Sequence, residues 1–172
     1  MRDEAAMEFE HVLLPGYEEW LERLSATYRA VAYCCYHRLR DREAAEGVSV
    51  EVVAEMLARP KVFGYYGLPF SGQIGRLAEP RIDRARQRTT VGGGDSSWQE
   101  LLIRLRSVSK EHQTTFVLTC IEGYTDTEVA LALGCGENTA RLRRENTMNL
   151  LRELSESALA PTRREPTDEG AH

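Results

Sequence analysis

Residues 125–144, which read TDTEVALALGCGENTARLRR, decide the fold of this 172-residue chain. Thr125 and Glu128 form the capping-box pattern that begins a helix, because each side chain can bond the backbone N–H of the other residue. Apolar residues continue to Leu133, and the glycines that follow it predict a tight turn. A longer helix is expected over about 137–155. Together these features predict a helix-turn-helix, whose second helix enters the major groove of DNA.

Small and basic residues support the helix-turn-helix. Ala130 supplies the small side chain that two closely crossing helices need, and Arg141 and Arg144 can share one face of the second helix. An arginine in the groove can bind a guanine edge, whereas one on the flank, such as Arg143, neutralises a phosphate. The alternatives are a plain packing corner between two helices and, for Arg143, a solvated side chain. The DNA contacts expected on this helix are Asn138, Thr139, Arg141, Leu142, Arg143 and Arg144.

The N-terminal half shows helical periodicity as well. Apolar residues recur every three or four positions from Tyr17 to Leu39, after the Pro15-Gly16 breaker, and predict a long amphipathic helix. Further helices are expected over about 41–58 and about 71–88. Pro80 lies inside the last of these and is expected to kink or restart it, because proline has no N–H and clashes with the preceding turn.

Three consecutive glycines at 92–94 mark the best domain boundary and predict a flexible linker. After it, helices are expected over about 98–107 and about 110–122, the second with Ser109 as its N-cap and Gly123 at its end. With no strand pattern, the expected fold is all-α, with two small helical domains joined by a flexible linker. The expected divisions are an N-terminal extension (1–15), a first domain (16–88), a glycine-rich linker (89–97), a second domain (98–157) and a disordered tail (158–172).

Composition excludes several classes of protein. No apolar run reaches the ~20 residues of a membrane helix, and the acidic N-terminus lacks the layout of a signal peptide. The four cysteines are too few for a disulfide scaffold and show no CxxC spacing, so we expect reduced thiols, a cytoplasmic location and no metal or cofactor. Because neither a nucleophile elbow nor a phosphate loop is recognisable, the chain is expected not to be an enzyme.

Charge is distributed unevenly along the chain. The net charge is −5, yet residues 61–90 carry six basic and two acidic side chains, a net charge of +4. Clustered arginine can mark a nucleic-acid site, and a solvated helix face is the alternative. Phe63, Tyr65 and Tyr66 lie in a glycine-flanked loop of this segment, where aromatic rings can stack on unpaired bases or fill the core.

The C-terminal part resembles region 4 of bacterial sigma-70 family factors and is closest to the small extracytoplasmic-function group. The N-terminal part is similar to region 2 of that family. The sequence departs from the family at Pro80, where asparagine is usual, at Glu137, which puts an acid at the start of the second helix, and at residues 44–51, which lack two acids and a glutamine. The segments that carry the resemblance are 30–33, 39–46, 48–57, 69–74, 77–78, 82–83, 111–118, 121–130, 133–135 and 138–141.

The resemblance implies a sigma factor that binds core RNA polymerase and directs promoter-specific initiation without catalysis. The C-terminal helix would read the minus-thirty-five element. The helices that dock on polymerase would present Arg38, Asp41, Glu46 and Glu51. Expected partners are promoter DNA and core RNA polymerase, with an anti-sigma factor left open. The residues that would bind the opened minus-ten element are Phe63, Tyr65, Tyr66, Arg76, Arg81, Arg84 and Arg88.

Two other functions stay open. A sigma-like regulatory protein would bind polymerase or a regulator without initiating on its own, which the thinned acidic motif, Pro80 and the negative net charge favour. A stand-alone helix-turn-helix regulator would use its N-terminal helices for dimerisation. Promoter initiation with core polymerase separates the first function from these two, and binding to a palindromic site without polymerase indicates the last.

Overall fold

The computed structural model describes residues 12–60, 72–87 and 98–159, and these ranges contain helices and no strand. The prediction of an all-α fold is therefore confirmed. None of the helices in these ranges is long and apolar enough to cross a membrane. In chain order the elements are α2 (Pro15–Leu39), α3 (Arg42–Ala58), α5 (Gly72–Gln87), α6 (Trp98–Arg106), α7 (Lys110–Phe116), the π-helix η1 (Val117–Ile121), α8 (Asp126–Leu133) and α9 (Glu137–Leu159).

Capping residues place the helix ends close to where the sequence predicts them. The Ser109 hydroxyl accepts a hydrogen bond from the backbone N–H of His112, and that of Thr125 accepts one from Glu128. Gly123 and Gly134 adopt φ of +70° and +66°, a left-handed conformation in which glycine has no steric penalty. These four residues therefore fix the ends of α7–η1 and α8.

Two helices differ from the sequence prediction, and a third limits it. The helix expected over 110–122 ends as α7 and continues as one wider turn, η1, in which Glu122 N–H donates to the carbonyl of Val117, five residues back. The helix α5 contains Pro80 and continues as one helix to Gln87, so of the two expected effects, a kink or a restart, the restart does not occur. The helix α9 extends to Leu159, so the prediction of a disordered tail from residue 158 is wrong for its first two residues.

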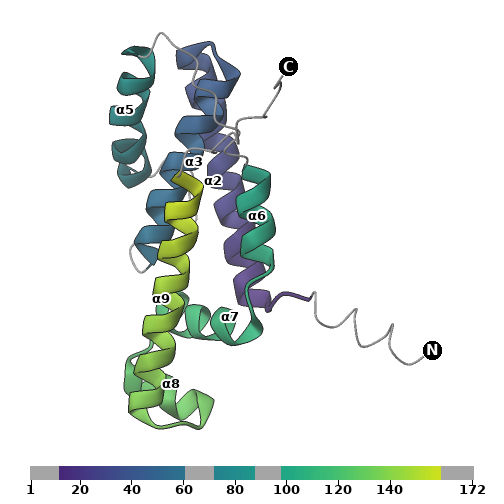
Figure 1. The fold of residues 1–172 in the computed structure, drawn as a ribbon, viewed down its shortest axis with the longest axis vertical. Helices are drawn as coiled ribbons and strands as arrows, with labels where there is room; N and C mark the ends of the chain where they lie inside the picture. The colour runs from purple at the N-terminus through teal and green to yellow at the C-terminus, as the bar shows by residue number, and fades with distance from the viewer. Residues whose placement is uncertain (1–11, 61–71, 88–97, 160–172) are drawn as a thin grey trace, which may run out of the picture.

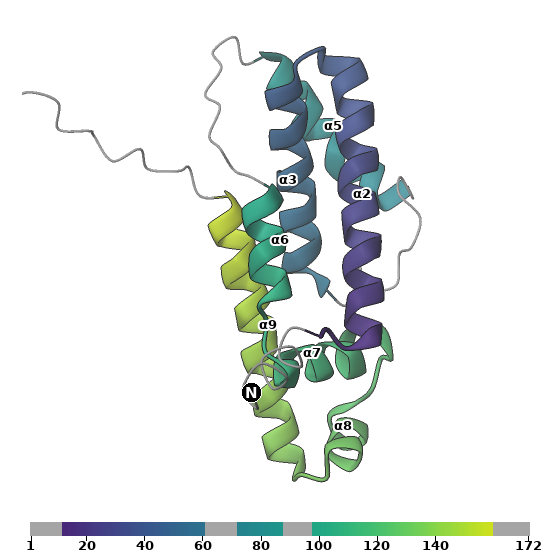
Figure 2. The ribbon, with the colours of Figure 1, turned by 90° about the vertical axis from the view of Figure 1, so that its right-hand side faces the viewer.

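The long helices lie side by side along the molecule. Figures 1 and 2 show α2, α3, α6 and α9 running along the long axis, with α5 against one end of this bundle and α8 at the other. The short helix α7 lies across the bundle near the start of α2. The end that carries α8 therefore projects away from α5.

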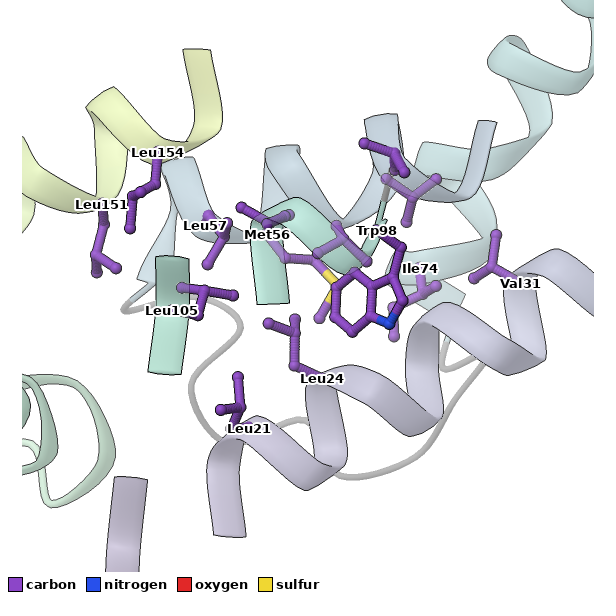
Figure 3. Packing of buried hydrophobic residues seen from close by; sticks show 14 of the residues in the cluster. Leu21, Leu24, Val31, Met56, Leu57, Ile74, Trp98, Leu105, Leu151 and Leu154 are labelled. Carbon is purple, nitrogen blue, oxygen red and sulfur yellow. The ribbon is translucent and has the colours of Figure 1, made fainter. Parts of the chain in front are cut away.

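One hydrophobic core joins the two predicted domains. Tyr28 of α2 stacks on Trp98 of α6, with ring centroids 4.5 Å apart and planes 9° apart. Because this cluster is continuous, the prediction of two small helical domains is not confirmed; the predicted linker, 89–97, lies outside the described residues. Buried side chains of this cluster shown in Figure 3 include Leu21, Leu24, Val31, Met56, Leu57, Ile74, Trp98, Leu105, Leu151 and Leu154.

Buried hydrogen bonds also cross between the two parts. The Tyr17 hydroxyl donates to the carbonyl of Leu105 over 2.5 Å, and burial raises the pKa of this phenol above its ordinary range. The Ser155 hydroxyl of α9 donates to the carbonyl of Ala54 in α3 over 2.8 Å. A buried polar group that loses its partner costs about 1–3 kcal/mol, so these bonds fix which surfaces of the two parts meet.

Candidate nucleic-acid interface

The helices α8 and α9 form the predicted helix-turn-helix around a small core of their own. Val129 and Ala130 of α8 are buried against Ala140 of α9. Ala140 is fully buried, and its methyl group leaves room for the two helices to approach closely. The small side chain predicted at position 130 therefore lies at the crossing, and it meets a second alanine there.

The turn between α8 and α9 is tight because its backbone is hydrogen-bonded on both sides. Cys135 N–H donates to the carbonyl of Ala130, and Ala140 N–H donates to that of Gly136, each over 3.0 Å. Gly134 supplies the left-handed residue that ends α8. The direction of α9 relative to α8 is thus set by backbone bonds as well as by the alanine contact.

The first turns of α9 expose one polar face. Asn138, Thr139, Arg141 and Leu142 are all exposed, on the side of the helix away from Ala140. Leu142 is 57% exposed and adds an apolar side chain to this face. Amide, hydroxyl, guanidinium and methyl groups on one helix face can bind the edges of base pairs in a major groove.

The arginines of α9 fall into separate roles. Arg144 donates from Nε and Nη2 to the two carboxylate oxygens of Asp126 in α8, over 2.8 and 3.2 Å. Arg141 Nε lies 3.7 Å from the same carboxylate, at an oxygen that Arg144 already uses. Arg143 Nε lies 3.3 Å from Glu111 of α7. Of the predicted groove arginines, Arg141 is therefore the more available and Arg144 is held within the helix-turn-helix.

Only part of the predicted minus-ten surface lies within the described residues. Arg76 and Arg84 are exposed on α5. Arg81 instead is 18% exposed and points at α3, with its nitrogens 3.7 Å from Glu51 and 3.6 Å from Glu55. The helix α5 is anchored to the core by Ile74, Ala78 and Ile82. The remaining predicted residues, Phe63, Tyr65, Tyr66 and Arg88, lie outside the described residues.

The four residues predicted to contact polymerase all have partners inside the chain. Asp41 is the N-cap of α3 and accepts from the N–H groups of Glu43 and Ala44. Arg38 binds both carboxylate oxygens of Glu79 in α5 and lowers the pKa of that carboxyl. In the other two pairs, the Glu46 carboxylate lies 3.2 Å from Arg42 and the Glu51 carboxylate lies 3.7 Å from Arg81.

Some residues that shape the site have no sequence signal of their own. His112 Nδ1 lies 2.7 Å from the buried Thr147 hydroxyl, a contact that joins α7 to α9. Asp126 has no sequence signal beyond its place at the start of a helix, yet its carboxylate is shared by two arginines. No group of three or more metal-ligating side chains occurs in the described parts of the chain. Comparisons with family models, curated proteins and solved structures found no match.

Proposed function

We propose that this protein is a DNA-binding transcription initiation factor of the sigma type. It binds core RNA polymerase and reads the minus-thirty-five promoter element with the first half of α9. The observation that carries the proposal is the α8–α9 helix-turn-helix, whose second helix exposes Asn138, Thr139, Arg141 and Leu142 on one face. The resemblance of the sequence to sigma-70 region 4 adds the link to polymerase.

The position of the helix-turn-helix supports groove binding. Both views place α8 and the start of α9 at one end of the molecule, beyond the bundle of long helices. A duplex can therefore approach α9 without meeting α3 or α5. The Glu137 carboxylate at the helix start interacts favourably with the helix dipole, and it disfavours phosphate directly at this terminus. Specific contacts are accordingly expected from the next turn, at Asn138, Arg141 and Leu142.

The proposal assigns the opened minus-ten element to the neighbourhood of α5. Arg76 and Arg84 are exposed there, and a cationic surface can follow a single strand. Arg81 is not included, because its guanidinium is directed at two carboxylates of α3. The two proposed DNA surfaces then lie at opposite ends of the molecule (Figure 1).

The proposal is tested by run-off transcription from genomic fragments with purified core polymerase and the full chain. We expect initiation at a defined set of promoters, and Arg141→Ala should reduce the preference for those promoters by roughly 10- to 100-fold, the range of one lost bidentate base contact. Arg106→Ala, at an exposed arginine of α6, is the control and should initiate normally. A stable polymerase complex without initiation would overturn the sigma function.

The shared core favours a second candidate function. Since α9 packs on α3 through Leu151 and Leu154, the helix-turn-helix and the N-terminal helices form one body. A stand-alone helix-turn-helix regulator would use such a body without separating its parts. Binding of the full chain to a palindromic duplex without polymerase, together with a dimer in sedimentation, would favour this function over the sigma type.

A further inference from the structure

Asp126 controls the arginines of α9. We infer that its carboxylate is a specificity-determining group. It holds Arg144 in a two-bond ion pair and leaves Arg141 as the arginine that can bind DNA. This inference rests on the proposed function, because it assigns the carboxylate a role in DNA reading. Asp126 itself stands at the first position of α8 and is not placed in contact with DNA.

The geometry separates the two arginines. Arg144 makes a two-bond, charge-assisted pair with Asp126, at 2.8 and 3.2 Å, the strongest arrangement open to a guanidinium. Its side chain is 26% exposed, whereas that of Arg141 is 52% exposed. Arg141 Nε is 3.7 Å from the carboxylate, within ion-pair distance and too far for a hydrogen bond. Arg141 can therefore bind DNA without losing a hydrogen bond to Asp126.

Charge explains why holding one arginine and leaving the other available raises the specificity for DNA sequence. Two arginines and one carboxylate leave a net charge of +1 at the base of the exposed face. Without the carboxylate, both guanidinium groups could neutralise phosphates on a duplex of any sequence, and non-specific affinity would rise. If only one arginine can leave the carboxylate, it contributes most binding free energy where a guanine edge accepts two of its hydrogen bonds.

The pair works in both directions. The Asp126 carboxylate holds the Arg144 guanidinium in place, and Arg144 in turn engages both carboxylate oxygens of Asp126. If Arg144 were removed, both oxygens of the carboxylate would be open to Arg141, which already lies beside one of them. Arg141 would then be drawn back from the exposed face. Arg144 thus acts on DNA reading through Asp126 and Arg141 and needs no DNA contact of its own.

The first experiment compares the full chain with the Asp126→Asn, Arg144→Gln and doubly substituted variants. The probes are the duplex that the wild-type chain, with core polymerase, selects from a randomised library, and a scrambled duplex. Asp126→Asn should bind the scrambled duplex several-fold more tightly, with a salt-dependence slope steeper by about 0.9 for each added phosphate contact. Arg144→Gln should bind the selected duplex roughly 10-fold more weakly, and the double variant should recover that loss.

The recovery is the decisive result, because a purely structural role of Arg144 would leave the double variant as weak as the single one. That weakness in the double variant, or an unchanged ratio of selected to scrambled binding in Asp126→Asn, overturns the inference. Glu19→Gln is the matched control, since it removes a carboxylate that pairs with an arginine of α2, Arg23, which has no place in the proposed DNA surfaces, and it should leave the ratio unchanged.

A second experiment needs no DNA and separates this inference from the proposed function. Solvent exchange of the arginine Nε–H protons, followed by NMR, should be slow for Arg144 and fast for Arg141 in the wild-type chain. In Arg144→Gln, exchange at Arg141 should become slow. Exchange at Arg141 that stays fast overturns the inference alone. If no duplex is selected, the proposed function fails, and the assigned role of Asp126 fails with it.

Discussion

The two halves of α9 have opposite surroundings. In the first half, residues 137–147, Asn138 and Leu142 face solvent, and the few buried side chains contact the neighbouring short helices. In the second half, Leu151 and Leu154 join the main core, and Ser155 donates a hydrogen bond to α3. The first half therefore leaves a surface exposed to solvent, while the second half fixes that surface to the body of the protein.

The contrast shows how the helix-turn-helix and the body of the protein are connected. The helix α9 is continuous over 23 residues, which at about 1.5 Å per residue gives a length of about 34 Å. Because no break separates its halves, the helix-turn-helix can turn relative to α3 only if the packing at Leu151 and Leu154 opens. Substitutions in the buried half of α9 can therefore test whether the helix-turn-helix is rigidly attached to the body or free to move.

The largest expected effect comes from removing a buried anchor. Leu151 is 2% exposed, and Leu151→Ala should lower the free energy of unfolding by about 2–5 kcal/mol, through lost transfer energy and the cavity left behind. Urea unfolding followed by circular dichroism measures this change. The matched control is Leu142→Ala in the first half, which should change stability by less than about 0.5 kcal/mol.

Binding should show the reverse order. Leu142→Ala should weaken binding to the selected duplex, because an exposed leucine can contact a thymine methyl group in the groove. Leu151→Ala should retain such binding under conditions where it stays folded. Equal effects of the two substitutions on stability would contradict the division of α9 into an exposed half and an anchoring half.

The second prediction concerns the alanine crossing. Ala140→Leu should cost about 1–3 kcal/mol, because a fully buried position has no room for three further carbon atoms. The strain falls on the small core of Val129 and Ala130, so hydrogen exchange should accelerate in α8 and remain slow in α3. The matched control is Ala132→Leu, at an exposed position of α8, which should leave exchange unchanged. Acceleration throughout α3 would show that the two cores open together.

The sequence predicts the helix ends well because the signals are local. Ser109, Gly123 and Thr125 each act on backbone groups within a few residues, so their effect does not depend on the rest of the fold. The wider turn η1 has no such local signal. One extra residue within Val117–Ile121 leaves the spacing of the apolar residues nearly unchanged.

The shared core and the ion pairs could not be predicted in the same way. Helical periodicity shows that Leu151 and Trp98 belong to buried faces, but it does not say which helix covers them. Arg144 and Asp126 are 18 positions apart, and Arg81 meets two carboxylates of another helix. Each of these contacts depends on how helices are arranged in space. For that reason the list of basic residues was predicted, and their division into exposed and internally paired arginines was not.

A smaller effect is expected from the cap of α8. Thr125→Ala removes the acceptor of the Glu128 N–H bond and should cost about 1 kcal/mol. Because α8 belongs to the small core, the loss should appear first as faster hydrogen exchange in the helix-turn-helix. Thr127→Ala, at an exposed position two residues further on, is the control and should have little effect. If the two variants behave alike, the cap does not limit the stability of α8.

The last prediction uses thiols to compare the main core with the helix-turn-helix. Cys35 of α2 is fully buried, whereas Cys135 in the turn is half-buried. Burial raises the pKa of the Cys35 thiol from 9.0 to about 11, so the folded chain holds this proton to higher pH than the unfolded chain does. The stabilising contribution is therefore complete below about pH 9 and is lost as the pH rises through about 11. A Cys35→Ala variant should lose less stability over this window.

At about pH 8, iodoacetamide should label Cys135 in the native protein and spare Cys35, because the thiolate is the reacting form and Cys35 is neither exposed nor ionised. Mass spectrometry of the labelled peptides measures which cysteine is labelled first. Labelling of Cys35 before Cys135 would show that the core around α2 opens more readily than the turn.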